Sequence, residues 1–187
     1  MKKDLKVQPN FFPMPVAMIG TYGEDGSVDV MNMAWGGINA MDEVTLNISP
    51  SHQTSKNILA KKAFTLAMAD RAHMVEADFL GIVSAKKDPE KFEKSGLTAV
   101  KSAHVDAPVI QEFPYSLECE VIKIEEGAEM QVVGKIVNIQ ADEAILNDDG
   151  QVDLKKLDPI LFDCFSSQYF TVGEPVGKCY NIGKKLM

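Results

Sequence analysis

The chain has 187 residues, of which 45% are hydrophobic and 25% are charged, a balance typical of a globular protein with a sizeable core. The formal net charge of −8 at pH 7 argues against nucleic acid and anionic membrane surfaces as partners. The N-terminal stretch MKKDLKVQPN lacks the continuous apolar region of a secretory signal, and no apolar run is as long as a membrane-spanning helix. We therefore expect a single cytoplasmic domain over residues 1–187.

The first part of the chain predicts strands that are separated by turns. Pro15–Tyr22 is an apolar run bounded by proline and glycine, and a Gly-Glu-Asp-Gly turn separates it from a second strand that ends at Asn32. Together these segments predict a β-hairpin. Apolar and polar residues alternate over Glu43–Ser49, which predicts a strand that Pro50 ends, because proline offers no N–H to a β-ladder.

A helix and a further strand are predicted next. Thr54 or Ser55 is a suitable N-cap residue for a helix that continues through KNILAKK. Apolar residues at every second position favour a strand over Ala63–Asp70, although the same residues could also continue the preceding helix.

Two more helices are expected before the second half of the chain. The apolar residues of His73–Ser84 recur at helical spacing, which predicts an amphipathic helix. The segment KKDPEKFEKSG predicts a short helix with Asp88 at its N-cap, Pro89 in its first turn and Gly96 at its end.

The second half of the chain is rich in predicted strands. YSLECEVIKIEE and EMQVVGKIVNIQADEAIL both alternate, and the EGAE segment between them indicates a long antiparallel hairpin. NDDG indicates a turn, and PILFDCF and QYFTVGEPVG predict a last strand pair. Many strands with a few helices inserted midway do not fit the alternation of a doubly wound sheet. The order favours a mainly β fold, an antiparallel β-barrel with helical insertions.

Local motifs give little support to metal, thiol or dinucleotide chemistry. Cys119, Cys164 and Cys179 form no CxxC pair, so we expect free thiols, as in a reducing cytoplasm, with Cys119 as a small core residue. The three histidines have no metal-ligand spacing, and no metal site is predicted. GEPVGKCY has one residue too few between its glycines for a phosphate loop, and no GxGxxG fingerprint occurs.

Two segments have an unusual mixture of side chains. VDVMNMAWGG combines methionines, an amide and the one tryptophan, which suits either a flat heteroaromatic ligand or a core strand that ends at a bulge. NISPSHQTSKNI places hydroxyl, imidazole and ammonium groups at a strand-to-helix junction. The N–H groups of a helix N-terminus can hold a phosphate there, or the hydroxyls only cap the helix. Capping is the simpler interpretation of this second segment taken alone.

Together, these segments resemble the flavin reductase-like family, the FMN-binding split barrels that include flavoredoxin. The resemblance runs from MPVAMIGTY, DVMNMAWGG and NISPSHQTSKNI to SAKKDPEKFEKSGLTAV, SLECEV, VVGKIVNI and YFTVGEPVG, so it covers nearly the whole chain. The chain departs from the family pattern at Ala85 and at the two residues before Lys91. These departures leave the roles of Lys86, Lys87 and Lys91 open.

The resemblance implies a six-stranded antiparallel Greek-key barrel that forms a homodimer and binds FMN at or near the subunit interface. It implies flavin reduction by hydride transfer from NADH or NADPH to the flavin N5 atom. It names no catalytic side chain, because the cofactor carries the chemistry. Two alternatives stay open: a flavoredoxin-like electron carrier that is served by a redox partner protein, and a non-enzymatic binding module.

The resemblance also implies which residues hold the cofactor. Carried over residue by residue, it implies contacts to the isoalloxazine ring or ribityl chain by Asn32, Met33, Ala34 and Trp35, a pocket wall of Asn47, Ile48 and Ser49, and a phosphate cradle of Ser51, His52, Thr54, Ser55 and Lys56.

Overall fold

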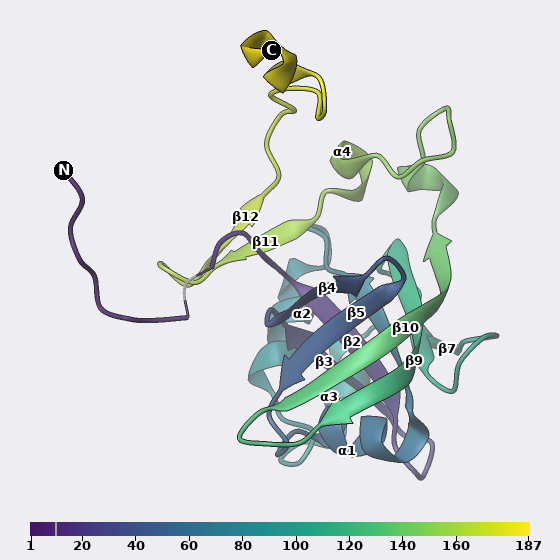
Figure 1. Ribbon diagram of the computed structural model, residues 1–187. Helices are drawn as coiled ribbons and strands as arrows, with labels where there is room; N and C mark the ends of the chain where they lie inside the picture. Colours follow the sequence, from purple (N-terminus) through teal and green to yellow (C-terminus); the bar gives the residue numbers. More distant parts are fainter. Residues whose placement is uncertain (10) are drawn as a thin grey trace.

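A seven-stranded antiparallel sheet forms the body of the computed structural model, which describes residues 1–9 and 11–187 (Figure 1). Its strand order is β3-β2-β6-β9-β10-β5-β4. The strands are β2 (Ala17–Tyr22), β3 (Val28–Met33), β4 (Gly36–Ala40), β5 (Glu43–Ile48), β6 (Ala63–Met68), β9 (Tyr115–Glu125) and β10 (Met130–Ala141). The fold is mainly β with a few helices, as the strand order in the sequence predicts, and it is the split barrel that the family resemblance implies.

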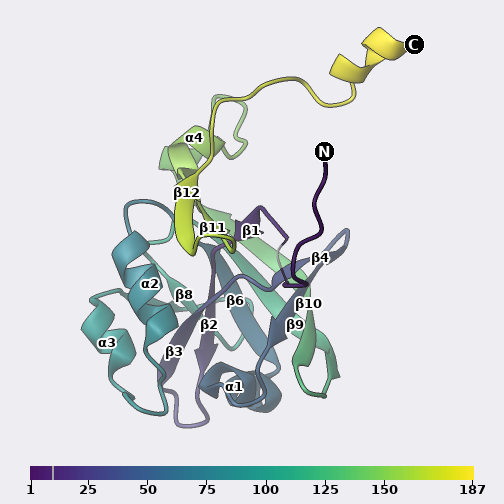
Figure 2. The same ribbon diagram turned by 90° about the vertical axis from the view of Figure 1, so that its left-hand side faces the viewer.

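Smaller elements surround this barrel. A three-stranded sheet contains β1 (Met14–Pro15), β11 (Ile160–Asp163) and β12 (Gln168–Thr171), and a hairpin contains β7 (Ala99–Lys101) and β8 (Pro108–Ile110). The helices are α1 (Gln53–Lys61), α2 (Met74–Ile82), α3 (Lys91–Ser95) and α4 (Leu154–Leu157), with 3₁₀ turns at Glu143–Ile145 and Ile182–Leu186. Helices α2 and α3 lie together beside β3, while α1 lies at one end of the barrel (Figure 2). In the described ranges, no helix is long and apolar enough to cross a membrane.

Most of the predicted elements are confirmed. Strands β2 and β3 form the first hairpin, in the register Ala17↔Met33 to Tyr22↔Val28. The ambiguous segment after α1 is the strand β6, and the long hairpin is β9–β10. Strands β11 and β12 pair as the closing hairpin. The first predicted strand, Pro15–Tyr22, begins at Ala17 in the structure, because Pro15 belongs to β1 and pairs with Leu161 of β11.

The structure corrects the predicted N-cap of α1. Thr54 and Ser55 both lie inside the first turn, because the helix begins at Gln53. The Thr54 hydroxyl donates to Asp29 Oδ2 at 2.5 Å, and the Ser55 hydroxyl donates to the Ser49 carbonyl at 2.7 Å. Neither hydroxyl caps the helix, because both residues lie inside it and His52 occupies the N-cap position.

The start of α3 and the strand β4 were also missed. Helix α3 begins at Lys91, so the predicted Asp88 N-cap is wrong; the Asp88 carboxylate instead accepts from Lys94 Nζ at 2.7 and 2.8 Å. The predicted end at Gly96 is confirmed, with φ of 73° in the left-handed region that favours glycine. Strand β4 extends the sheet from six strands to seven, although its two glycines indicate a break in the sequence.

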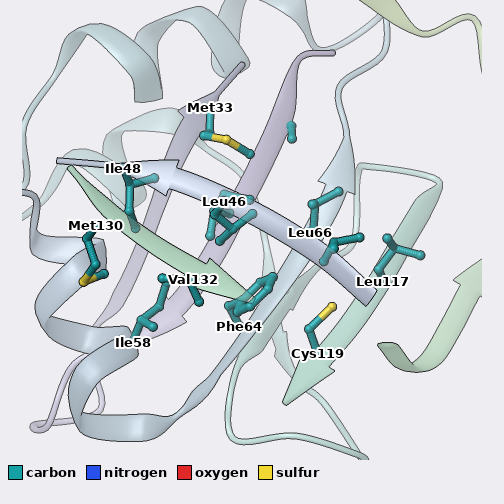
Figure 3. Packing of buried hydrophobic residues seen from close by; sticks show 13 residues of the cluster. Met33, Leu46, Ile48, Ile58, Phe64, Leu66, Leu117, Cys119, Met130 and Val132 are labelled. Carbon is teal, nitrogen blue, oxygen red and sulfur yellow. The ribbon is translucent and has the colours of Figure 1, made fainter. Parts of the chain in front are cut away.

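The main core fills the barrel interior (Figure 3). Phe64, Leu46 and Val132 are fully buried there, as is Cys119, which confirms the predicted core position of this thiol. Burial, with the adjacent Glu118, raises the pKa of the Cys119 thiol to about 12. Full burial of an apolar side chain such as Phe64, Leu46 or Val132 stabilises the fold by about 1.5–3 kcal/mol.

A second core cluster lies outside the barrel and positions the helices. Met18 and Val30 of the β2–β3 hairpin belong to the same buried cluster as Leu80 of α2 and Phe92 of α3. This apolar contact holds α2 against β3, beside the end of the strand where the candidate ligand residues begin.

Candidate functional site

The barrel is split where the chain passes from β3 to β4. These two strands lie at opposite ends of the sheet order, and only Ala34 and Trp35 connect them. The Asn47 N–H of β5 donates to the Trp35 carbonyl at 2.8 Å and so links the two sides. The turn requires glycine next, because a Cβ on Gly36 would lie 2.6 Å from the Thr45 carbonyl oxygen. The ends of β3 and β5 therefore meet at this seam.

A cavity of about 230 Å³ lies at this seam, and we call it the seam pocket. Most of its lining is apolar or aromatic, with a few polar groups, as is common in small-molecule sites. The lining residues are Met31, Asn32, Met33, Ala34, Trp35, Asn47, Ile48, Asp78, Gly81, Ile82, Phe162 and Tyr169.

Aromatic rings form one wall of the seam pocket. The ring centroids of Trp35 and Phe162 are 6.3 Å apart, with an interplanar angle of 52°. Phe162 of β11 is paired with Tyr169 of β12, and their ring centroids are also 6.3 Å apart. The small sheet thus brings two rings to the tryptophan of the β3–β4 connection.

Helix α2 supplies a more polar wall, which contacts the aromatic wall at Tyr169. The Tyr169 hydroxyl donates to Asp78 Oδ1 at 2.7 Å, and Asn32 Nδ2 donates to the Ala77 carbonyl at 3.2 Å. Burial, together with the hydrogen bond and charge of Asp78, raises the pKa of Tyr169 to about 12, so this phenol stays protonated at neutral pH. The helix approaches closely at Gly81, where an added Cβ would lie 3.0 Å from Asn32 Cβ.

A second cavity of about 310 Å³ lies next to the first, at the start of α1, and we call it the junction pocket. The two cavities share Met31, Asn32, Gly81 and Ile82. The other residues that line the junction pocket are Asp29, His52, Gln53, Thr54, Leu80, Val83, Ser84, Ala85 and Lys91.

A buried ion pair forms part of the junction pocket. Lys91 Nζ lies 3.1 Å from Asp29 Oδ1, and the two side chains are only 4% and 5% exposed. The ammonium also donates to the carbonyls of Leu80 at 3.4 Å and Val83 at 3.3 Å, at the end of α2. Since Thr54 donates to the same aspartate, this cluster joins β3, α1, α2 and α3.

The structure brings the predicted site residues together unequally. The seam pocket is lined by Asn32, Met33, Ala34, Trp35, Asn47 and Ile48, and the junction pocket by His52, Thr54 and again Asn32. Neither pocket is lined by Ser49, Ser51, Ser55 or Lys56. The hydroxyls of Ser49 and Ser51 instead lie 3.0 Å from each other.

Several lining residues were missed by the sequence analysis. In the seam pocket they are Met31, Asp78, Gly81, Ile82, Phe162 and Tyr169, and in the junction pocket they include Asp29 and Lys91. Lys91 lies in the quoted segment SAKKDPEKFEKSGLTAV and Tyr169 in YFTVGEPVG, but nothing in either segment indicates which distant side chain each one contacts.

Comparisons with known proteins agree with this architecture. The family model described as "Flavin reductase like domain" matches residues 10–162. The structure of flavoredoxin of Desulfovibrio vulgaris (Miyazaki F) is 35% identical, with a TM-score of 0.93 over 98% of this chain and 100% of that chain. Flavoredoxin from Methanosarcina acetivorans is 27% identical, with a TM-score of 0.89 over 100% of both chains. Nitrilotriacetate monooxygenase component B from Bacillus cereus shares the fold at 18% identity, with a TM-score of 0.82 over 95% of this chain and 100% of that chain.

Proposed function

The chain belongs to the flavin reductase-like family, and on that basis we propose that it is an FMN-dependent oxidoreductase that takes electrons from NADH or NADPH. One observation carries the proposal: the residues expected to hold the flavin ring, among them Asn32, Trp35 and Asn47, line a single cavity at the barrel seam. Apolar and aromatic side chains surround these amides, and such a surface suits a flat ring with polar edges.

The seam pocket fits the isoalloxazine ring of FMN. Trp35 and Phe162 offer aromatic faces, and Asn32 and Asn47 offer side-chain amides to ring heteroatoms. Gly81 leaves the wall beside Asn32 open, where a side chain would intrude. These features support a ring that lies in the seam with α2 along one side.

The junction pocket fits the FMN phosphate. It contains the first turn of α1, whose N–H groups have no partner within the helix and carry partial positive charge. No acidic residue lies in that turn, and Lys91 neutralises Asp29 in the pocket lining. We propose that His52, Thr54 and Lys91 adjoin the phosphate, with Ser51, Ser55 and Lys56 contributing from the same junction.

When bound, FMN would accept hydride at its N5 atom and pass electrons on, while the protein supplies binding and orientation. Trp35 and Phe162 would cover the ring and exclude water from part of it. Asn32 is held by the Ala77 carbonyl and would fix the ring edge relative to α2. Tyr169 stays protonated and holds the Asp78 side chain at the pocket wall.

A flavoredoxin-like electron carrier is the second candidate function. The 35% identity to a flavoredoxin over 98% of this chain favours it. In this role a redox partner protein, rather than a nicotinamide, would exchange electrons with the same bound FMN.

Visible absorption spectroscopy tests the proposal. We would add FMN to the purified protein and then NADH or NADPH under anaerobic conditions. A bound-flavin spectrum that bleaches with a nicotinamide supports the reductase. A bound flavin that stays oxidised supports the carrier, and protein that binds no flavin would contradict both and leave a non-enzymatic binding module.

We also propose that residues 1–187 form one domain that works as a homodimer in the cytoplasm. Large apolar side chains are exposed on β4 and in the turn after it, where Ile38 is 75% and Met41 101% exposed. The segment after β12 runs away from the barrel and exposes Tyr180 and Leu186 (Figures 1 and 2). Exposed apolar surface of this kind supports an interface between copies. Sedimentation equilibrium should give twice the chain mass, and a monomer mass would contradict the dimer.

Replacing Gly81 by leucine should weaken FMN binding at least about tenfold, since a few badly placed atoms in a pocket are worth about 1–3 kcal/mol. An added Cβ would already lie 3.0 Å from Asn32 Cβ, and the longer side chain would extend further into the lining of both pockets. Leucine is a good helix former, so α2 itself should persist. Quenching of FMN fluorescence measures the dissociation constant.

Gly127→Leu is the matched control, because it lines neither pocket and an added Cβ there would make only an ordinary contact, 3.4 Å from the Glu129 carbonyl oxygen. Its FMN affinity should equal that of the unaltered protein. Equal affinities for the Gly81 and Gly127 variants would show that the ring does not lie beside α2.

A further inference from the structure

Among the described residues that line the seam pocket, Asp78 is the one with a charged side chain. The other polar groups there are the amides of Asn32 and Asn47 and the phenol of Tyr169. The wall formed by α2 therefore gives this otherwise neutral cavity a carboxylate and no lysine, arginine or histidine.

The position of this carboxylate is fixed by a hydrogen bond from the aromatic wall of the pocket. Tyr169 donates to Asp78 Oδ1 at 2.7 Å across a sequence separation of 91 residues. The tyrosine ring packs on Phe162, and Phe162 packs on Trp35, with ring centroids 6.3 Å apart in both pairs. Contacts through Tyr169 and Phe162 thus connect Asp78 to Trp35 at the seam.

The nearby cations that the structure describes pair with other carboxylates than Asp78. Of the cations on the neighbouring elements, Lys91 forms its ion pair with Asp29, and His73 Nδ1 lies 2.9 Å from Asp70 Oδ1. Within the described part of the chain, no ion pair includes Asp78. Its negative charge therefore acts on whatever occupies the seam pocket.

We propose that Asp78, held in place by Tyr169, lowers the reduction potential of the flavin that binds in the seam pocket. This inference rests on the proposed function, because it requires FMN in that pocket. It applies equally to a nicotinamide-dependent reductase and to an electron carrier, because the same bound flavin ring is reduced in both.

The charge balance of reduction gives the direction of the effect. Transfer of a hydride from a nicotinamide breaks its C–H bond, forms an N–H bond at flavin N5 and moves two electrons and one proton, so the nicotinamide becomes a cation and the ring gains one negative charge. A nearby carboxylate opposes that added charge until a second proton arrives from solvent. The oxidised ring is neutral, so the charge of Asp78 has little effect on the binding free energy of oxidised flavin. The carboxylate therefore weakens binding of the reduced flavin more than binding of the oxidised flavin, which lowers the potential.

The direct test is Asp78→Asn in the FMN-loaded protein. The asparagine keeps the size and the acceptor oxygen that Tyr169 uses, and it removes only the charge. An anaerobic redox titration against a reference dye should show the midpoint potential raised by at least about 30 mV, which is a tenfold change for a two-electron couple. Oxidised FMN should bind the variant as tightly as it binds the unaltered protein.

Glu93→Gln is the matched control, because Glu93 is exposed on α3 and lines neither pocket. It removes the same formal charge and should leave the potential unchanged. Tyr169→Phe is the second variant, because it keeps the ring on Phe162 but removes the donor to Asp78. Without that hydrogen bond the carboxylate charge is less compensated, so the potential should fall. Opposite shifts in two variants of one contact would not follow from a merely structural role.

Each failure has its own meaning. If the unaltered protein binds no FMN, the proposed function is wrong. If FMN binds and Asp78→Asn has the same potential as Glu93→Gln, only the role of Asp78 is wrong. Loss of oxidised FMN from Asp78→Asn would also overturn the inference, because it would make the carboxylate part of the binding surface rather than a charge that opposes reduction. If Asp78→Asn does not fold, the sign of the Tyr169→Phe shift decides, and an unchanged or raised potential refutes the inference.

Discussion

Replacing Lys91 by methionine should lower the free energy of unfolding by about 3–5 kcal/mol, because it leaves the charge of Asp29 buried without a counter-ion. The two side chains are 4% and 5% exposed, so water cannot take over the role of the ammonium. The carbonyls of Leu80 and Val83 would lose a donor at the same time. Methionine has a similar length and apolar character, so little of the loss would come from a cavity. Chemical denaturation measures the change.

Two further variants isolate the ion pair as the cause. Asp29→Asn combined with Lys91→Met should recover most of the lost stability, since no charge is then buried alone. Lys94→Met removes a lysine from the same helix, where its pair with Asp88 is half exposed, and should cost less than about 1 kcal/mol. A Lys91→Met variant no less stable than Lys94→Met would show that the cluster does not hold α3 against β3.

Most strands were predictable from the sequence, because apolar and polar residues alternate along a strand that has one buried face. Strand β4 was not, since it begins with two glycines and exists by pairing with β5 in the register Ile38↔Val44. The predicted N-cap residues of α1 and α3 were wrong because local sequence does not determine which residue begins a helix. Thr54 is a suitable N-cap residue by type, but the helix begins one residue before it, and its hydroxyl donates to Asp29, 25 residues earlier in the chain.

The candidate site divides in the same way. The segments around Asn32–Trp35 and Asn47–Ile48 attract notice through their own composition and their family resemblance, and the fold brings them to one cavity. Asp78 was missed because it is one of two acids on a predicted amphipathic helix, and such acids have the pattern of solvated residues. Its partner Tyr169 lies 91 residues further along, on β12 of the three-stranded sheet, so no local signal in the sequence connects the two residues.

Replacing Glu118 by glutamine should lower the free energy of unfolding at neutral pH by about 2–4 kcal/mol, since hydrogen bonds to a charged group are worth about 1.5–3 kcal/mol each. Glu118 is fully buried, and its Oε1 accepts from Asn138 Nδ2 and Gln140 Nε2, both at 2.6 Å. Its Oε2 accepts from the Ser102 hydroxyl, whose oxygen already accepts the N–H groups of residues 104 and 105. An amide NH₂ in place of Oε2 would therefore face an oxygen without a free acceptor site.

The effect of Glu118→Gln should also depend on pH, with a sign that the structure determines. Burial alone raises the pKa of Glu118, but hydrogen bonds from Ser102, Asn138 and Gln140, with the charge of His104, bring the pKa below its ordinary value. A depressed folded-state pKa means that the carboxylate stabilises the fold above its unfolded pKa of about 4.3 and that this contribution is lost as the pH falls through the folded-state value.

The difference in unfolding free energy between the two proteins should therefore be constant from about pH 6 to 8 and shrink below about pH 4. Glu120→Gln is the control on the same strand, because Glu120 is exposed and should show little loss at any of these pH values. A Glu118→Gln difference that persists undiminished into acid would mean that shape, rather than charge, makes this residue important. A difference that vanishes in acid would identify the buried carboxylate as the group that fixes Ser102 and the chain after it against β9 and β10.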